Sequence, residues 1–373
     1  MSFVDWIVVA CGGLIGFTWI GYPLCIAVLA ALRARPVATP WPAPPPVSVV
    51  LATRESPDAI AARVADVLAA RYDGALQVVV ALDPRTVEEP STNVRFDDPR
   101  VTVVAGDAPG GKTATLNAGV RAATGELLVF TDTAQRFEPD AIARLVDCLA
   151  DERMGAVSGA LHLPGDEGRP SLAERYWRYE RWLRRNEARV HSTVGVTGAV
   201  YAMRRARWTP LPADLILDDV YVPMRLSLEG WRIGFHEHAI ARDGRRTTAG
   251  QEYRRKVRTL TGNLQLCAWL PAVLVPVRNP IWLQFVCHKL LRLLTPWLLA
   301  GLVLGSGWIA ADRRGAALAR VVPWVGALVL VVLLVTPLRR RALSAVGWFL
   351  SLQAAVVRAT INGVRGQWNV WGV

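Results

Sequence analysis

The chain has 373 residues, of which 52% are hydrophobic, and its mean hydropathy is positive. A purely soluble domain is rarely so apolar, and the length allows one sizeable α/β domain plus membrane helices. Its 43 basic and 31 acidic residues give a net charge of +12, which suits nucleic acid, anionic lipid or a phosphorylated substrate. No zinc-finger spacing or aromatic-basic RNA motif is present, so we expect no nucleic-acid partner and favour lipid headgroups and phosphates. The five cysteines form no CxxC pair, as expected of small core residues in a reducing compartment.

The first apolar stretch covers residues 7–32 and is longer than the roughly 20 residues that span hydrocarbon. Asp5 precedes it, and Arg33 and Arg35 follow it, which is unlike the charge order of a signal peptide. The positive-inside rule then predicts an external N-terminus and a cytoplasmic location for the chain that follows. Residues 36–46 are rich in proline and predict an extended linker.

Strands and helices then alternate, which predicts βαβ units and a parallel sheet. Strands are expected over residues 47–52, 76–82, 101–105, 127–130 and 155–161, and helices over residues 60–71, 112–124 and 141–150. A charged, aromatic-rich helix over residues 171–191 and a glycine-marked strand region over 195–203 follow. The segment 215–230 then places Asp218 and Asp219 just ahead of a further helix. The pattern predicts a doubly wound α/β domain.

Two acidic residues, Asp83 and Asp132, come directly after predicted strands. Ligands of open α/β sheets bind where parallel strands end, because the loops there line one crevice. A carboxylate at this place suits Mg²⁺ or Mn²⁺ that carries a diphosphate, since these metals prefer oxygen ligands. The simpler alternative is an acid that is merely solvated.

A second interpretation of this region is a nucleoside triphosphatase. Residues 106–113, GDAPGGKT, fit the pattern GxxxxGK[ST] after an apolar run, and Lys112 would then bind the terminal phosphates. Against it, a strand, a helix and a second strand precede the motif, and only about twenty residues separate Lys112 from Asp132.

Apolar runs return near the C-terminus. Residues 293–309 and 321–338 predict two spans, and residues 342–357 either span or lie in the interface. We therefore divide the chain into five parts. An N-terminal transmembrane helix (residues 1–35) and a linker (36–46) precede a cytoplasmic catalytic domain (47–250). Basic and interfacial helices (251–289) and a C-terminal transmembrane region of two or three helices (290–373) follow it.

Several short motifs occur in a characteristic order between residues 47 and 292: VSVVLATRE, VVVALD, GKTATLNAGV, ATGELLVFTD, GVTGAVYAMRR, LDDVYVPMRLSLEGWRIGF and QEYRRKVR. In this order the chain resembles membrane-bound family-2 inverting glycosyltransferases, the group of cellulose, chitin and hyaluronan synthases and bacterial exopolysaccharide transferases. The resemblance implies a GT-A-type nucleotide-sugar-binding domain with a mostly parallel central sheet. It also implies a multi-pass protein of the inner (plasma) membrane.

The resemblance further implies roles for single residues. Glu55 and Asp83 would contact the uracil and ribose of a donor that we expect to be UDP-linked, Lys112 would face its diphosphate, and Asp132 would hold Mg²⁺ or Mn²⁺. Asp219 would be the general base that deprotonates the acceptor hydroxyl, with Asp218 beside it. As an alternative role, an acid at this place caps the following helix. The acceptor would be lipid-linked or a growing polysaccharide.

The sequence departs from the family pattern at two places. The DxD or DxN metal motif reads Asp132-Thr133-Ala134, so its second ligand is missing; His236, His238 and Asp243 are candidates to compensate, although such histidines are more often structural. Gln251, Arg254 and Arg255 stand where processive members have QxxRW, with Arg in place of Trp, and would contact the diphosphate and the acceptor site, or else anionic lipid. An alternative to an active transferase is therefore a catalytically silent relative that acts as a binding or assembly subunit.

Overall fold

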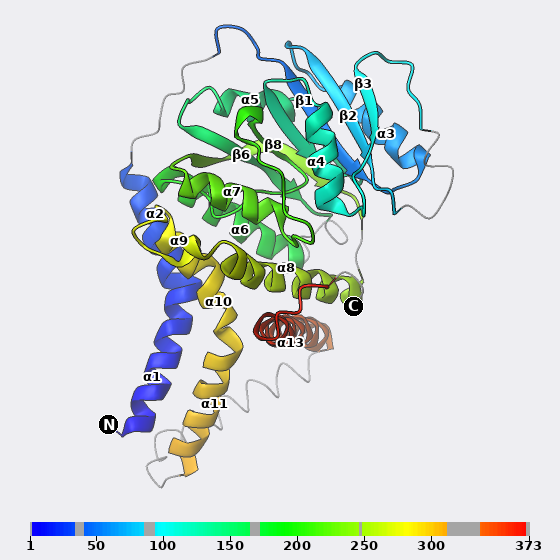
Figure 1. The fold of residues 1–373 in the computed structure, drawn as a ribbon. Helices are drawn as coiled ribbons and strands as arrows, with labels where there is room; N and C mark the ends of the chain where they lie inside the picture. The colour runs from blue at the N-terminus through cyan, green and yellow to red at the C-terminus, as the bar shows by residue number, and fades with distance from the viewer. Residues whose placement is uncertain are drawn as a thin grey trace. The chain divides into compact units, whose positions relative to one another are not determined.

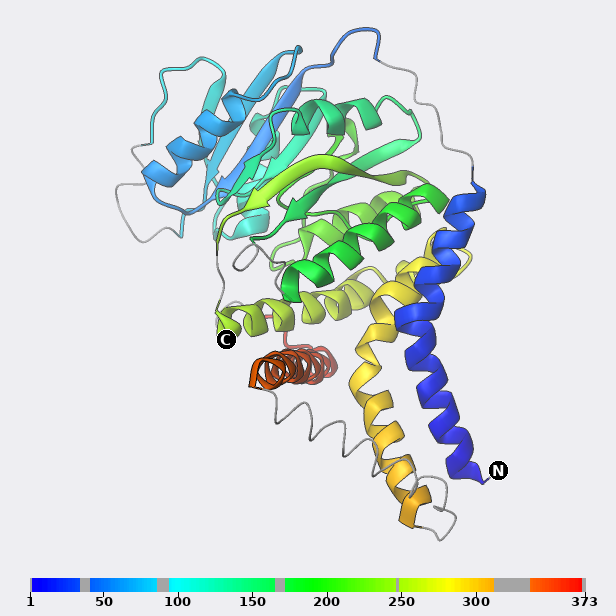
Figure 2. The same ribbon diagram turned by 180° about the vertical axis from the view of Figure 1, so that it is seen from behind.

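The computed structural model describes residues 2–33, 41–85, 94–164, 172–245, 248–311 and 336–370 (Figures 1 and 2). The chain forms two compact units. The sheet unit comprises residues 26–247 and 265–285, and the helical unit comprises residues 1–25, 248–264 and 286–373. The finer domain boundaries given above remain predictions.

A single eight-stranded sheet, in the order β3-β2-β1-β4-β7-β6-β8-β5, organises the sheet unit. The strands are β1 (Val47–Thr53), β2 (Leu76–Leu82), β3 (Val101–Ala105), β4 (Leu127–Thr131), β5 (Gln135–Phe137), β6 (Met154–His162), β7 (Tyr201–Arg204) and β8 (Arg232–Asp243). Strands β3, β2, β1 and β4 are parallel, as predicted. Strand β7 is antiparallel to β4 and β6, β8 is parallel to β6, and β5 is antiparallel to β8. The sheet is thus mixed: the expected parallel pairing joins β3, β2, β1 and β4 throughout, whereas among the other strands only β6 and β8 are parallel.

Helices cover both faces of this sheet. They are α3 (Pro57–Leu68), α4 (Lys112–Ala122), α5 (Ala141–Cys148), α6 (Leu172–Val190) and α7 (Asp218–Leu228), with the short elements η3 (Arg205–Arg207), η4 (Pro271–Leu274) and α9 (Trp282–Phe285). We call the face under α3 and α5 the first face and the face under α4 and α7 the second face. Helix α6 packs beside β8 (Figure 2).

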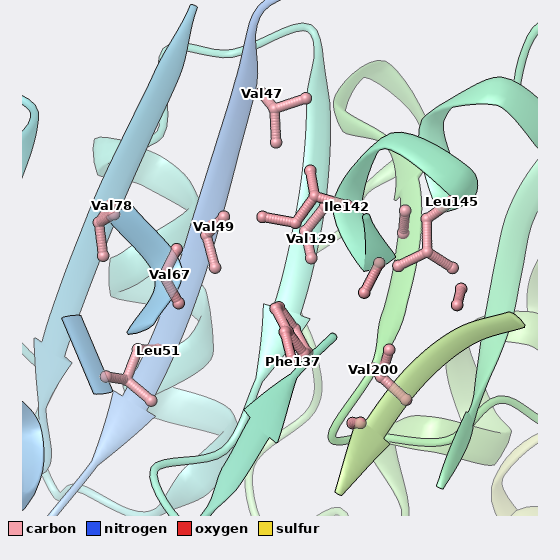
Figure 3. Packing of buried hydrophobic residues seen from close by; sticks show 14 of the residues in the cluster. Val47, Val49, Leu51, Val67, Val78, Val129, Phe137, Ile142, Leu145 and Val200 are labelled. Carbon is pink, nitrogen blue, oxygen red and sulfur yellow. The ribbon is translucent and has the colours of Figure 1, made fainter. Parts of the chain in front are cut away.

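The core follows the alternation of side chains along each strand, because successive residues of a strand point to opposite faces. Val47, Val49 and Leu51 of β1 pack on the first face with residues of α3 and α5 (Figure 3). Val50, between them, packs on the second face. Burying one such side chain contributes about 1.5–3 kcal/mol. Gly119 lets α4 come close on the second face, since a Cβ there would lie 2.8 Å from Val50 Cγ1.

The helical unit contains α1 (Phe3–Gly16), the π-helical segment η1 (Phe17–Gly21), the start of α2 (Tyr22–Leu32) and most of α8 (Ala249–Trp269). It continues with η5 (Val286–Leu290), α10 (Leu291–Leu293), α11 (Thr295–Ala311) and α13 (Thr336–Val364). Among the described residues, one helix of 30 residues, Phe3–Leu32, is long and apolar enough to cross a membrane. The segments Trp282–Leu293 and Thr295–Ala311, bent by 55°, would add a second crossing if they form one span.

Close contacts join α1 to α11 inside the helical unit. A Cβ added at Gly305 would lie 2.6 Å from Val8 Cγ2, and one at Gly301 would lie 3.0 Å from Cys11 Sγ. The predicted span over residues 321–338 lies almost wholly outside the described residues. The segment 342–357 is helical, as part of α13, and its placement in a membrane remains a prediction.

Candidate active site

The acid at the end of β4 lies on the second face of the sheet. Leu128 and Phe130 pack on that face, so alternation turns Thr131 to the first face and Asp132 back to the second. On the first face, the buried Arg63 donates from Nη2 to Thr131 Oγ1 over 2.5 Å. The side chain of Asp132 is 42% exposed and can therefore meet a ligand from solvent.

Lys112 joins this acid to the acids of α7. Two glycines with positive φ, Gly110 at 88° and Gly111 at 101°, turn the chain so that α4 begins at Lys112. Its Nζ lies 3.1 Å from Asp218 Oδ1 and 3.9 Å from Asp132 Oδ1. Burial lowers the pKa of Lys112, but nearby carboxylates, Asp218 first, more than offset this effect and raise it above its usual value. Lys112 therefore stays charged.

Asp218 and Asp219 form the first turn of α7, where the helix dipole stabilises negative charge. Neither acid is the N-cap, since that residue is Leu217 and no side chain caps the helix. The main-chain oxygen of Asp219 accepts the N–H of Val196 over 2.8 Å. A Cβ at Gly198 would lie 3.7 Å from Asp219 Oδ2, so the absence of a side chain there keeps this carboxylate uncrowded.

The two acids thus have different surroundings. Asp218 is 7% exposed at its side chain and is paired with Lys112. Asp219 is half-buried and lies beside Gly198. Of the two, Asp219 is the one that a hydroxyl group can approach.

Strands β2, β1 and β4 are neighbours and parallel, so Asp83, Glu55 and Asp132 come to the same edge of the sheet. Glu55 is exposed beyond the end of β1. Asp83 is 7% exposed, and its Oδ1 accepts the N–H of Gly111 over 3.0 Å. Arg85 donates to the same carboxylate from its main-chain N, its Nε and its Nη2, at 3.1, 3.2 and 2.9 Å. Burial raises the pKa of Asp83, but these hydrogen bonds lower it by a larger amount. The pKa of Asp83 therefore lies below its usual value.

This arrangement counts against the triphosphatase interpretation of residues 106–113. In such a phosphate cradle the backbone N–H groups of the loop point at the nucleotide. Here the N–H of Gly111 is already bonded to Asp83, and Lys112 turns to Asp218.

The unit of an Asp and the Arg two residues later, bonded three times as in Asp83 and Arg85, we call an Asp-x-Arg clip. A second clip lies at the end of β8, where Arg245 donates to Asp243 over 3.0, 3.1 and 2.8 Å. Gln135 Nε2 also donates to Asp243, over 2.8 Å. The carboxylate of Asp243 is therefore already engaged by Gln135 and Arg245. Among the described residues, two further clips join Asp98 to Arg100 and Asp151 to Arg153.

Sequence reasoning missed Arg63, which contacts the end of β4 on the first face of the sheet. Its side chain is fully buried, pairs with Asp66 and lies 4.1 Å above the ring of Phe137. Burial lowers the pKa of Arg63 to about 10 despite the neighbouring Asp66. No local sequence signal marks this residue, because an arginine on an amphipathic helix usually faces water.

Gln251, Arg254 and Arg255 lie on α8, in the part that belongs to the helical unit. Gln251 Oε1 accepts the N–H of Thr248 over 2.9 Å and so helps to begin that helix. The contact of these three residues with a diphosphate or an acceptor stays a prediction.

The donor set of the sheet unit was compared with the needs of a divalent metal. Within the described ranges, no group of three or more His, Cys, Asp or Glu side chains could hold a metal ion. Asp132 is exposed, and the buried Oε1 of Gln135 has no hydrogen-bond partner among the described residues. One carboxylate is nevertheless compatible with Mg²⁺, which is often held by one or two carboxylates together with phosphates and water. The residues thus fit a metal that arrives with a diphosphate.

Residues 44–262 match the family model described as "Glycosyltransferase like family 2". The match covers more than half of the chain, so the protein belongs to this family and is a glycosyltransferase.

One solved structure of high coverage has this fold. The chain is similar to the mannosyltransferase PcManGT from Pyrobaculum calidifontis, solved with GDP-Man and Mn²⁺, with 22% identity and a TM-score of 0.73 over 98% of this chain and 99% of that chain. The sheet unit thus has the GT-A-like α/β fold. A mycobacterial protein shares 17% identity over 65% of this chain and 78% of its own, with a TM-score of 0.43. No curated protein matches the sequence.

Proposed function

We propose that the protein transfers a sugar, a hexose, from a nucleotide-sugar donor to a lipid-linked or growing polysaccharide acceptor at the cytoplasmic face of the inner membrane, with inversion at the anomeric carbon. The observation that carries this proposal is the ion-pair cluster in which Lys112 Nζ lies 3.1 Å from Asp218 and 3.9 Å from Asp132. This cluster connects the proposed donor side of the crevice to the proposed base.

Asp219 acts as the general base in this mechanism. The acceptor hydroxyl loses its proton as its oxygen attacks the anomeric carbon from the side opposite the diphosphate. A carboxylate suffices, because the hydroxyl becomes strongly acidic only in the transition state. Asp218 pairs with Lys112 and so holds the start of α7 and the Lys112 side chain in place.

Lys112 and Asp132 act on the leaving group. As the glycosidic bond breaks, negative charge grows on the diphosphate, and a fixed ammonium group stabilises it. A bound Mg²⁺ or Mn²⁺ would add Lewis-acid stabilisation to the same oxygens, and Asp132 is the residue that would hold it. Glu55 and Asp83 stand on the nucleotide side, Glu55 directly and Asp83 through its clip with Arg85.

The proposed donor is UDP-linked, with GDP-mannose as the next candidate, because the similar mannosyltransferase was solved with that nucleotide sugar. The apolar helix Phe3–Leu32 supports a membrane location, and an acceptor with a lipid anchor would reach Asp219 without leaving the bilayer. Gln251, Arg254 and Arg255 would contact the diphosphate or the acceptor.

The decisive experiment measures sugar transfer by membranes that contain Asp219→Asn or Asp218→Asn protein, after a mass-spectrometric donor screen with the wild type. We expect Asp219→Asn to lower kcat by about 10²–10⁴-fold while donor binding stays within a few-fold of wild type, since the lost group acts only on the acceptor proton. Near-normal transfer by this variant would refute the assignment of the base.

Two alternatives give different results in the same assay. A silent assembly subunit would neither transfer sugar nor hydrolyse the donor, even in its wild-type form. A triphosphatase would turn over ATP, would lose this activity with Lys112→Ala and would be indifferent to Asp219→Asn.

A further inference from the structure

The second clip places a cation where the metal motif is incomplete. In the antiparallel pairing of β5 with β8, Gln135 lies opposite Asp243. Gln135 directly follows Ala134, the position at which the metal motif lacks its second oxygen ligand. Arg245, two residues beyond Asp243, is therefore held next to the loop that carries Asp132.

The clip fixes the guanidinium group and leaves part of it available. Arg245 uses Nε and Nη2 to bind the two oxygens of Asp243. A guanidinium group has five N–H donors, so Nη1 and one hydrogen of Nη2 remain on its outer edge. The Asp243 side chain is 5% exposed whereas that of Arg245 is 57% exposed, so the anchor is buried and the outer edge is accessible.

The electrostatic surroundings place this group at the candidate active site. Hydrogen bonding to Asp243 is the largest effect that raises the pKa of Arg245, and the carboxylates of Asp132 and Glu55 raise it as well. Arg245 is thus within electrostatic range of both proposed donor-side acids. The clips at Asp98 and Asp151 have the same local geometry, but neither of their arginines has Asp132 or Glu55 among the charges that shift its pKa.

We propose that Arg245 binds the diphosphate of the nucleotide donor as a fixed cation, and that it gives donor binding a component that does not depend on a metal. The inference rests on the proposed function, because it concerns the same donor. A guanidinium fork suits two oxygens of one phosphate, and charge-assisted bonds of this kind are about twice as strong as neutral ones. Ala134 leaves Asp132 as the only acid in the metal motif, so the motif would hold a metal less firmly than one with two acids. The fixed charge of Arg245 would then balance part of the diphosphate charge that a firmly held metal would otherwise balance.

The test is calorimetric titration of the full-length protein with UDP and with GDP, once with MnCl₂ and once with EDTA. For the wild type we expect Kd in EDTA to rise by less than about tenfold. For Arg245→Gln we expect a further loss of about tenfold or more in EDTA, which corresponds to the 1.5–3 kcal/mol of a hydrogen bond to a charged group. Arg100→Gln breaks a clip of the same geometry and should bind as the wild type does.

A second variant is needed as a control for misfolding. Arg245→Gln leaves the buried Asp243 without its cationic partner and could therefore weaken binding by destabilising the fold. Arg245→Lys keeps the charge but not the fork, and we expect it to melt near the wild-type temperature and to bind about three- to tenfold more weakly in EDTA. If folded Arg245→Gln and Arg245→Lys bind UDP and GDP as tightly as the wild type in EDTA, the inference is wrong. The same holds if chelation abolishes wild-type binding. A wild type that binds neither nucleotide even with MnCl₂ would instead refute the proposed function.

Discussion

Tyr201 is a buried phenol below the acid cluster. It lies on the second face, its ring stacks on Phe130 with centroids 4.6 Å apart, and it is fully buried. Its hydroxyl has no hydrogen-bond partner among the described residues. Burial and the carboxylates of Asp218 and Asp219 raise the pKa of Tyr201, so the phenol stays neutral. An unpaired buried hydroxyl group costs folding free energy, which gives a prediction with a clear sign.

We expect Tyr201→Phe to leave the free energy of unfolding unchanged or to raise it by about 1 kcal/mol, because it removes the unpaired hydroxyl and keeps the stacked ring. Tyr72→Phe is the matched control: that hydroxyl donates to the main-chain oxygen of Pro45, so its loss should lower stability by about 0.5–1.5 kcal/mol. Thermal unfolding of both variants decides the matter, and a clear destabilisation by Tyr201→Phe would mean that its hydroxyl has a partner after all.

The first clip predicts how acid affects the protein. The folded-state pKa of Asp83 lies below its usual value. Such a group stabilises the folded state above the unfolded-state pKa, and this contribution is lost as the pH falls through the folded-state pKa. Removal of the Arg85 side chain takes away the strongest of the hydrogen bonds that lower the pKa of Asp83, so its folded-state pKa rises.

Arg85→Gln should therefore begin to unfold at a higher pH than the wild type when the protein is acidified. Tryptophan fluorescence during acid titration measures the midpoint. Arg100→Gln should shift the midpoint less, since Asp98 and Arg100 form their clip in solvent, where water screens it. Equal midpoints for wild type and Arg85→Gln would contradict the role given to this clip.

At the scale of secondary structure, the sequence predicts the parallel half of the sheet but not the direction of β7. Apolar runs and helical spacing identify β1, β2, β3 and β4, and they place Asp83 and Asp132 at strand ends. Strand β7 is apolar too, but a buried strand has the same pattern in either direction. Because β7 runs antiparallel to β4, the loop that precedes it reaches the active-site edge. This explains why Gly198 lies beside Asp219 and Lys112.

Arg245 shows a second limit of sequence reasoning. Asp243 and Arg245 are close in sequence, but the partner that ties them to the metal motif, Gln135, is 108 residues away from Asp243. Only the pairing of β5 with β8 creates that contact, and β5 is three residues long, too short for its pattern to be recognised. The spacing Asp-x-Arg is visible in the sequence, yet it occurs equally at positions remote from the site.

The contact of α11 with α1 gives a prediction for the helical unit. Gly305→Ala would place a Cβ 2.6 Å from Val8 Cγ2, so the helices must shift apart, which costs about 1–3 kcal/mol. Gly307→Ala, on the same helix, meets nothing within 4 Å and should be neutral or slightly stabilising. Melting temperatures in one detergent compare the pair. Equal stability of the two variants would argue against a tight contact at Gly305.

At the scale of the whole chain, the predicted orientation across a membrane can be tested directly. The helix Phe3–Leu32 is long enough to cross, and Arg33 follows it, so we predict an external N-terminus and a cytoplasmic sheet unit. Single cysteines at Ser2 and Pro99, in a background without the native cysteines, test this in intact cells. An impermeant thiol reagent should label position 2 before lysis and position 99 only after it. The reverse order would overturn the predicted orientation.

The Asp-x-Arg clip also has a consequence for protein engineering. It needs two side chains, one turn and no distant partner. The described part of the chain forms it at four places, with donor–acceptor distances that agree within 0.5 Å, from 2.7 to 3.2 Å. A part so local can be transplanted. Writing Asp-x-Arg at a strand end of an unrelated α/β scaffold should install an oriented guanidinium group there, ready to be developed into a receptor for phosphorylated molecules.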